Sequence, residues 1–163
     1  MNGMTMEIFS YSELRNNAQR EINRLQRSET ELDKQSSIDH ALNAAFSIYH
    51  LIQWRHNEEN PHEKIIIKAH DFIQKTDNEG LQLLHDIVTK QKHVTVSQKT
   101  RPDEENKPLV YDNIINITTE DGVHLTTEND QPIVTEDSYI EVRFWDHRAM
   151  NILNDAMSEF STK

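Results

Sequence analysis

The sequence predicts a mainly helical (α+β) protein, a four- to five-helix bundle with a small antiparallel β insertion before the C-terminal helix. Apolar residues recur at helical spacing through most of the first 93 residues and again near the end. Between these regions lies an acidic stretch of alternating residues with an Asp-Gly pair. At 163 residues we expect one domain with a core of its own: a helical body (11–93), an acidic β insertion (94–144) and a returning helix (145–160).

The first predicted helix covers residues 11–31. Ser10 or Ser12 can cap its start, because a serine hydroxyl accepts hydrogen bonds from the first free backbone amides. Its apolar residues follow one stripe at i, i+4, i+8 and i+11, namely Leu14, Ala18, Ile22 and Leu25.

The second predicted helix covers residues 37–56, with its start near Ser36 or Ser37. Apolar residues occupy most of its circumference, which indicates a helix surrounded by others. We expect it to be the central helix of the bundle.

Asn60-Pro61 predicts that a short third helix starts there, because a capping residue precedes a proline at the first helical position. The run Ile65-Ile66-Ile67 could also be a strand, but the capping signal favours a helix. Gly80 is expected to break or kink the chain before a further helix over residues 81–93.

Strand signals begin after His93, where Val94-Thr95-Val96 alternates. Residues 109–118 and 123–127 flank Glu120-Asp121-Gly122, which predicts a hairpin turn. Residues 138–144 alternate as a half-buried strand does. The last predicted helix, 145–160, carries an apolar stripe of Met150, Leu153, Met157 and Phe160.

Composition excludes several classes of function. The chain has no cysteine, so thiol catalysis, disulfides and thiolate metal sites are excluded. It has no His-Glu-x-x-His, no Gly-x-Ser-x-Gly and only three glycines, so we expect no metal, no cofactor and no phosphate-binding glycine loop. Without an apolar run near the ~20 residues of a membrane span, or the pattern of a signal peptide, we expect a soluble cytoplasmic protein.

The net charge of −11 is concentrated in one segment. From Arg101 to Val142, eleven carboxylates oppose only Arg101 and Lys107, which leaves −9 there, whereas residues 1–100 carry −2. The acidity can serve solubility alone, or it can form a surface for a basic partner. Under the second interpretation the binding residues include Glu128, Asp130, Glu136 and Asp137.

Two predicted helices end in polar clusters that could meet. The candidate catalytic residues are His50, Arg55, His62, Asp86, Lys90 and His93. Histidine can act as a general acid or base and arginine can stabilise a phosphorane-like transition state, a combination that suits metal-free RNA cleavage.

Each of these residues also has a structural interpretation. Asp86 and Lys90 have the i, i+4 spacing of an ordinary intrahelical pair. On a largely apolar helix, His50 can be a hydrogen-bonded core residue and Trp54 a core or edge anchor.

With Arg55 at the end of a bundle helix and His62 six residues beyond it, the chain resembles the HEPN superfamily, whose signature is Arg, four to six residues, then His. That resemblance implies a metal-independent ribonuclease or toxin with its site across a homodimer. It implies roles for His93 or His62 as acid or base, Arg55 as phosphate stabiliser and Asp86 as the partner that orients Lys90 or His93.

Residues 37–160 also look like a group of uncharacterised bacterial and phage proteins. In that group a His-Leu-x-x-Trp helix (here His50 to Trp54) precedes a helix that ends in Lys-His (here Lys92-His93), then a short sheet and a helix. This second resemblance supports the fold and implies no activity.

Two functions are therefore expected. The first is a non-enzymatic interaction or regulatory protein, of phage or mobile-element type, whose acidic surface binds a basic protein partner. The alternative is a HEPN-like ribonuclease or a degenerate relative of one, and RNA is expected as a ligand only in that case.

Overall fold

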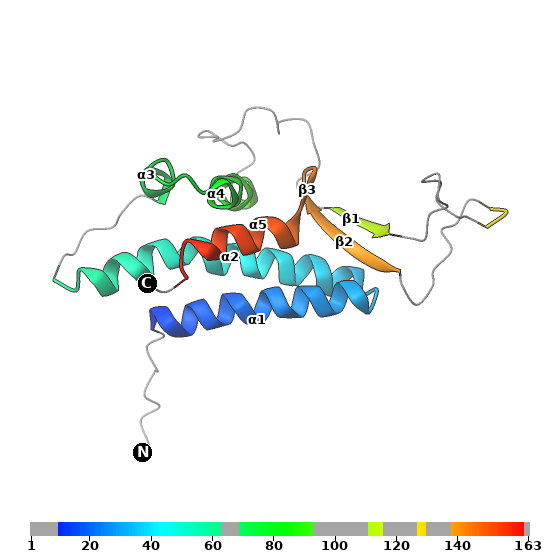
Figure 1. Ribbon diagram of the computed structural model, residues 1–163, viewed down its shortest axis with the longest axis horizontal. Coiled ribbons are helices and arrows are strands. Elements are labelled where there is room, and N and C mark those ends of the chain that lie inside the picture. The colour runs from blue at the N-terminus through cyan, green and yellow to red at the C-terminus, as the bar shows by residue number, and fades with distance from the viewer. Residues whose placement is uncertain (1–9, 63–68, 93–110, 116–126, 130–137, 162–163) are drawn as a thin grey trace, which may run out of the picture.

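The computed structural model describes residues 10–62, 69–92, 111–115, 127–129 and 138–161. Two long antiparallel helices form its base, and α5 lies along them (Figure 1). The view of Figure 1 looks nearly along α4, so α4 crosses the direction of the other long helices. The prediction of a mainly helical protein with a small antiparallel sheet before the last helix is confirmed.

Helix α1 (Tyr11–Thr30) begins as predicted. Ser10 accepts a hydrogen bond from the Glu13 backbone amide, and the Glu13 carboxylate accepts one from the Ser10 amide, which completes a capping box. Ala18, Ile22 and Leu25 of the predicted stripe are buried.

Helix α2 (Lys34–Glu59) starts three residues before the predicted Ser37, because Asp33 rather than Ser36 or Ser37 caps it. The Asp33 carboxylate accepts from the Ser36 amide at 3.1 Å, whereas Ser37 is buried and bonds Ser28. The prediction of a central helix agrees with its contacts, which reach α1, α3, α4, α5, β1 and β2.

The predicted helix start at Asn60-Pro61 is wrong. Asn60 instead ends α2, where its side-chain amide donates to the His56 carbonyl at 3.0 Å, and Pro61 and His62 form a turn. The three isoleucines lie outside the described residues. Helix α3 (Ala69–Ile73) is a single short helix that buries Ile73.

Gly80 does not break the chain, which corrects a second prediction. Residues 74–78 make the break, and Gly80 is the second residue of α4 (Glu79–Lys92). A Cβ at Gly80 would lie 2.7 Å from both the Ala156 nitrogen and the Ile152 oxygen. Glycine is therefore required because α4 meets the backbone of α5 there.

The sheet contains strands β1 (Tyr111–Ile115), β2 (Tyr139–Phe144) and β3 (His147–Arg148), in the order β1-β2-β3, all antiparallel. Tyr111 pairs with Arg143, and Arg143 pairs with Arg148. The predicted strand at 138–144 is confirmed, although more of it is buried than alternation indicates. Val94 to Val96 and the predicted hairpin turn lie outside the described residues.

The last helix starts later than predicted. Helix α5 covers Ala149–Ser158, and Trp145 and Asp146 turn the chain from β2 into β3. Trp145 has a positive φ of 53°, which a helix cannot contain, and its side chain is buried.

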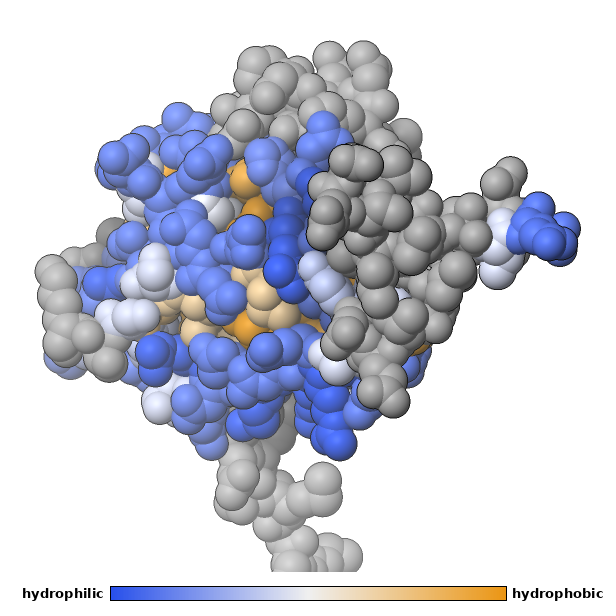
Figure 2. All heavy atoms as spheres, turned by 45° about the vertical axis from the view of Figure 1, so that its right-hand side comes forward, coloured by the Kyte–Doolittle hydropathy of each residue, from blue (hydrophilic) through white to orange (hydrophobic). Residues whose placement is uncertain are grey.

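One apolar core joins residues of α1, α2, α3, α4, β2 and α5. Hydrophilic side chains cover most of the described face in Figure 2, and apolar ones show in small patches, mostly near its centre. In the described part of the chain, no helix is long and apolar enough to cross a membrane.

Replacing Gly80 with alanine should destabilise the protein by about 1–3 kcal/mol, because the added methyl group meets backbone atoms that cannot rotate away. Urea unfolding followed by circular dichroism measures the loss. The control is Asn43→Ala, at an exposed position of α2, which should change stability by no more than about 0.5 kcal/mol. Equal stabilities for Gly80→Ala and the parent would contradict the close contact of α4 and α5.

Candidate functional site

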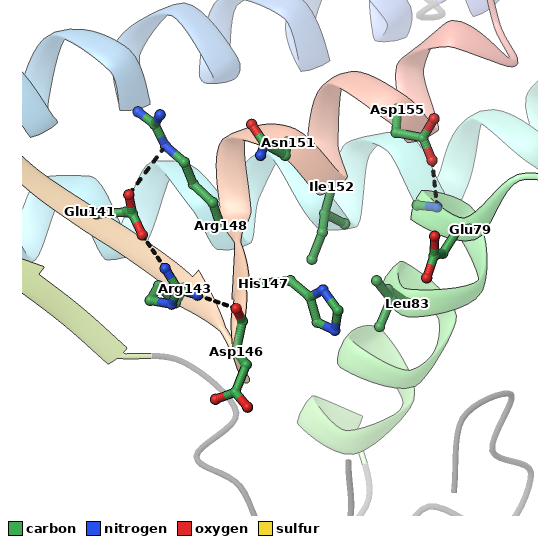
Figure 3. Close-up of a pocket in the computed structure, with 11 residues that line it drawn as sticks. Glu79, Leu83, Glu141, Arg143, Asp146, His147, Arg148, Asn151, Ile152 and Asp155 are labelled. Atoms are coloured by element: carbon green, nitrogen blue, oxygen red, sulfur yellow. Dashed lines mark hydrogen bonds and ion pairs between the residues drawn. The ribbon is translucent and has the colours of Figure 1, made fainter. Parts of the chain in front are cut away.

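A polar pocket of about 550 Å³ lies between the start of α4, the β2–β3 turn and α5 (Figure 3). Its walls come from two parts of the sequence, the start of α4 and the continuous stretch 141–155 that contains β2, β3 and α5. The charged side chains that line it are Glu79, Glu141, Arg143, Asp146, Arg148 and Asp155, joined by His147 and Asn151.

The sheet end of the pocket contains both arginines. The Arg143 guanidinium donates to the Glu141 carboxylate and to the Asp146 carbonyl. The Arg148 Nε lies 3.8 Å from Glu141 Oε2, so one carboxylate connects the two guanidinium groups (Figure 3). Both arginines are thereby engaged within the protein.

Behind this end lies a second buried carboxylate, that of Glu29 on α1. Its Oε1 accepts from the Val142 amide at 3.0 Å, and its Oε2 lies 3.6 Å from Arg148 Nη2. Burial raises the pKa of Glu29, and the nearby Glu141 charge raises it further. The Val142 amide and Arg148 oppose that shift. Arg148 thus lies between two carboxylates and ties α1 to the pocket.

The opposite end is formed where α4 begins. Asp155 accepts a hydrogen bond from the Gly80 amide at 2.7 Å, and the Asn78 amide donates to the Asp155 carbonyl at 2.9 Å. The side-chain oxygen of Asn78 in turn accepts from the Leu81 amide at 2.8 Å. Carboxylates near a helix N-terminus are stabilised by the helix dipole, so Asp155 and Glu79 are placed favourably there.

The chemistry available in the pocket is ionic. Four carboxylates oppose two arginines, so the lining has a net charge of −2 with His147 neutral. No serine, threonine, tyrosine or lysine occurs among the described lining residues. No group of three His, Asp or Glu close enough to hold a metal ion occurs within the described part of the chain. The arrangement suits binding of a cationic group better than covalent catalysis.

The predicted catalytic Arg55 lies elsewhere, in a hollow at the C-terminal end of α5. Its Nε donates to Glu59 at 2.9 Å and its Nη1 to the Glu159 carbonyl at 3.1 Å. Arg15 binds the neighbouring Phe160 carbonyl at 2.8 Å. Cations stabilise the carbonyl end of a helix, so Arg55 has a structural role here.

The other predicted catalytic residues are dispersed. His62 is exposed, and so is His50, which makes its interpretation as a core histidine wrong. Asp86 is buried beside His85, whose Nδ1 lies 3.0 Å from Asp86 Oδ1. Lys90 belongs to α4, although its side chain lies outside the described residues, as does all of His93.

The geometry of α2 separates Arg55 from the Asp86 region. Tyr49 faces His85 of α4, with ring centroids 6.3 Å apart. Arg55 is six residues further on, which is about 120° around the helix. Its described partners belong to α2 and the end of α5, so no described contact joins Arg55 to Asp86.

Of the predicted acidic binding residues, Glu128 lies in an exposed turn. Asp130, Glu136 and Asp137 lie outside the described residues. Sequence reasoning did not single out Glu79, Asp146, His147 or Asp155. A signal was present at Gly80, because an isolated glycine next to a helix can mark a close approach of another backbone as well as a break.

No protein-family model, curated protein or solved structure matches the chain. The resemblance to HEPN proteins therefore stays a prediction.

The buried Glu29 carboxylate should make stability depend on pH in a defined direction. Its raised pKa means that the folded state holds a proton that the unfolded state has released, so this group's contribution falls as pH rises above the ordinary value of 4.5. The free energy of unfolding of the parent, minus that of Glu29→Gln, should therefore decrease from pH 4.5 toward pH 8. Urea unfolding at each pH measures the difference.

Glu13→Gln is the matched control with the opposite sign. The Ser10 backbone amide and hydroxyl lower the pKa of Glu13, so its contribution is present at neutral pH and is lost as pH falls. If the stability difference between parent and variant changed with pH in the same direction for Glu29→Gln and Glu13→Gln, the opposite pKa shifts assigned to Glu29 and Glu13 would be contradicted.

Proposed function

We propose that this protein is a non-enzymatic interaction or regulatory protein that binds a basic segment of a protein partner through an acidic surface. The observation that carries the proposal is the charge of the pocket between α4, α5 and the β2–β3 turn. Its four carboxylates exceed its two arginines, and Glu141 and backbone groups already engage those arginines.

The pocket is also continuous in sequence with the acidic segment. Strands β1 and β2 carry residues of that segment, and Glu141, near its end, lines the pocket. The −9 of residues 101–142 and the −2 of the pocket therefore belong to connected parts of the chain. Opposite charges guide association and select among partners, which is the role proposed for this surface.

The exposed positions of Glu79, Asp146 and Asp155 favour a protein ligand. A partner's lysine or arginine can reach exposed carboxylates without first becoming fully buried. Each such contact contributes about 0.2–1 kcal/mol, so the proposed complex depends on several of them and weakens with salt.

The direct test measures anisotropy of a fluorescein-labelled octalysine peptide with purified variants. Replacing Glu79 with Gln and Asp146 with Asn should weaken binding by about 3–10-fold. Neutralising Glu128, Asp130, Glu136 and Asp137 together should weaken it by at least as much. Raising NaCl from 50 to 300 mM should reduce the affinity of the parent for the peptide. It should also reduce the difference in affinity between the parent and each variant.

The control removes two charges elsewhere, with Asp39→Asn and Asp71→Asn, both exposed and outside the pocket. The control and the Glu79/Asp146 variant change the net charge of the protein by the same amount. An equal loss of affinity in both would mean that overall charge, and not the pocket, determines peptide binding. The proposed surface would then be discarded.

Among the described residues, the contact between His85 and Asp86 favours the ribonuclease alternative, because a carboxylate can orient an imidazole for acid–base chemistry. It predicts RNA cleavage in the presence of EDTA by the parent and about 100-fold or greater loss in Arg55→Ala and His93→Ala. Circular dichroism must show that Arg55→Ala folds, since Arg55 binds α5. A folded parent that does not cleave RNA would end this alternative.

A further inference from the structure

Between residues 15 and 30, the exposed face of α1 carries hydrogen-bond donors and no carboxylate. We call it the donor face, and its exposed residues are Asn16, Gln19, Arg20, Asn23, Arg24, Gln26, Arg27 and Thr30. Asn, Gln and Arg recur in it at a spacing of seven residues, first as Asn16, Gln19 and Arg20 and then as Asn23, Gln26 and Arg27. Residues seven apart lie on nearly the same side of an α-helix, so the repeat forms a row about 16 Å long.

The two carboxylates of this stretch are buried on the other side of α1. Glu21 is 6% exposed, and its Oε2 lies 2.8 Å from Nδ1 of His40 on α2. Glu29 is 2% exposed and accepts from the Val142 amide of β2. Both carboxylates therefore join α1 to its neighbours, and the donors remain on the surface.

The arginines of the donor face can exchange their present contacts for a ligand. Arg20 donates to the neutral side-chain oxygen of Asn17 at 3.2 Å. Arg27 donates to Glu31 at 2.9 Å, but both side chains are more than half exposed, and an exposed ion pair is only weakly stabilising. A chain with a net charge of −11 thus presents a row of cationic and amide donors on one outer helix (Figure 1).

A row of cationic and amide donors complements a row of anionic oxygens. Arg, Asn and Gln side chains all donate hydrogen bonds to DNA phosphates. Duplex DNA carries one charge per about 1.7 Å of its axis, about twice the density of an extended chain of acidic residues.

The shape and composition of the donor face favour duplex DNA over other nucleic acids. The exposed residues listed for it include no aromatic side chain, on which the bases of a single strand would stack. The major groove of B-DNA, about 12 Å wide, admits an α-helix, whereas the major groove of duplex RNA is too narrow for side chains to read.

We propose that the donor face of α1 binds the backbone of double-stranded DNA. This surface is distinct from the proposed acidic surface and shares no residue with it. Arg20, Arg24 and Arg27 each neutralise one phosphate, so a plot of log affinity against log salt concentration has a slope of about −2.7. The acidic charges elsewhere in the chain oppose binding, and salt screens those that lie more than about 10 Å from the DNA.

The test measures anisotropy of a fluorescein-labelled 24-base-pair DNA with the full-length protein. Raising NaCl from 25 to 100 mM should weaken binding by the parent about 40-fold. Arg20→Gln and Arg27→Gln should each weaken binding and reduce the steepness of the salt plot by about 0.9, and the double variant by about 1.8. Circular dichroism checks that each variant is folded.

The matched control is Lys75→Gln, which removes one exposed positive charge just after α3. Helix α2 lies between α3 and α1, so this variant should give the affinity and the salt slope of the parent (Figure 1). The Glu79→Gln/Asp146→Asn variant should bind DNA at least as well as the parent, which separates this proposal from the proposed acidic surface.

The proposal is refuted if the folded parent does not bind the duplex at 25 mM NaCl, or if the α1 variants keep the salt slope of the parent. An equal loss in Lys75→Gln would refute it too, because overall charge would then explain binding. Duplex RNA, a single-stranded 24-mer and an octaglutamate peptide are the competing ligands. Tighter binding of any of them than of duplex DNA would overturn the assignment of DNA as the ligand.

Discussion

The close contact between the start of α4 and the middle of α5 is the constraint on which the candidate site depends. Gly80 lets the two backbones approach more closely than a residue with a Cβ would permit. At this distance the Asp155 carboxylate accepts a hydrogen bond from the Gly80 amide and caps α4. Asn78 reinforces the junction by joining the Asp155 carbonyl to the first turn of α4. The pocket exists because this junction holds Glu79 and Leu83 opposite the β2–β3 turn.

The second constraint is electrostatic. Glu29 and Glu141 are buried carboxylates that share Arg148, and Arg148 also lies over the Tyr139 ring with its guanidinium carbon 5.7 Å from the centroid. Removing Arg148 would leave two buried carboxylates without the cation that they share, which is strongly destabilising. These contacts join the sheet end of the pocket to α1.

Local signals predicted the local structure. The Ser10–Glu13 capping box and the apolar stripe of α1 depend on residues three or four apart, so the sequence alone was sufficient. The local signal at Asn60-Pro61 failed, because Asn60 bonds back to the His56 carbonyl and ends α2. Other predictions failed where distant segments decide. The pattern at Gly80 indicates a break when its contact with α5 is not known. Trp145 was assigned to the last helix, but it has a positive φ in the turn between β2 and β3.

The candidate site could not be predicted for the same reason. Glu79, Glu141 and Asp155 come from three elements, α4, β2 and α5. No regular spacing in the sequence predicts that these residues line one pocket. Arg55 was selected from a sequence motif, but its hydrogen bonds to Glu59 and to the end of α5 depend on tertiary packing.

The most direct test of the α4–α5 junction is a nuclear Overhauser measurement on the isotope-labelled protein. A strong signal between the Gly80 Hα protons and the Ala156 amide proton is expected from the close approach of their backbones. The absence of that signal, in a protein whose other helical contacts are observed, would contradict the junction and the pocket that depends on it.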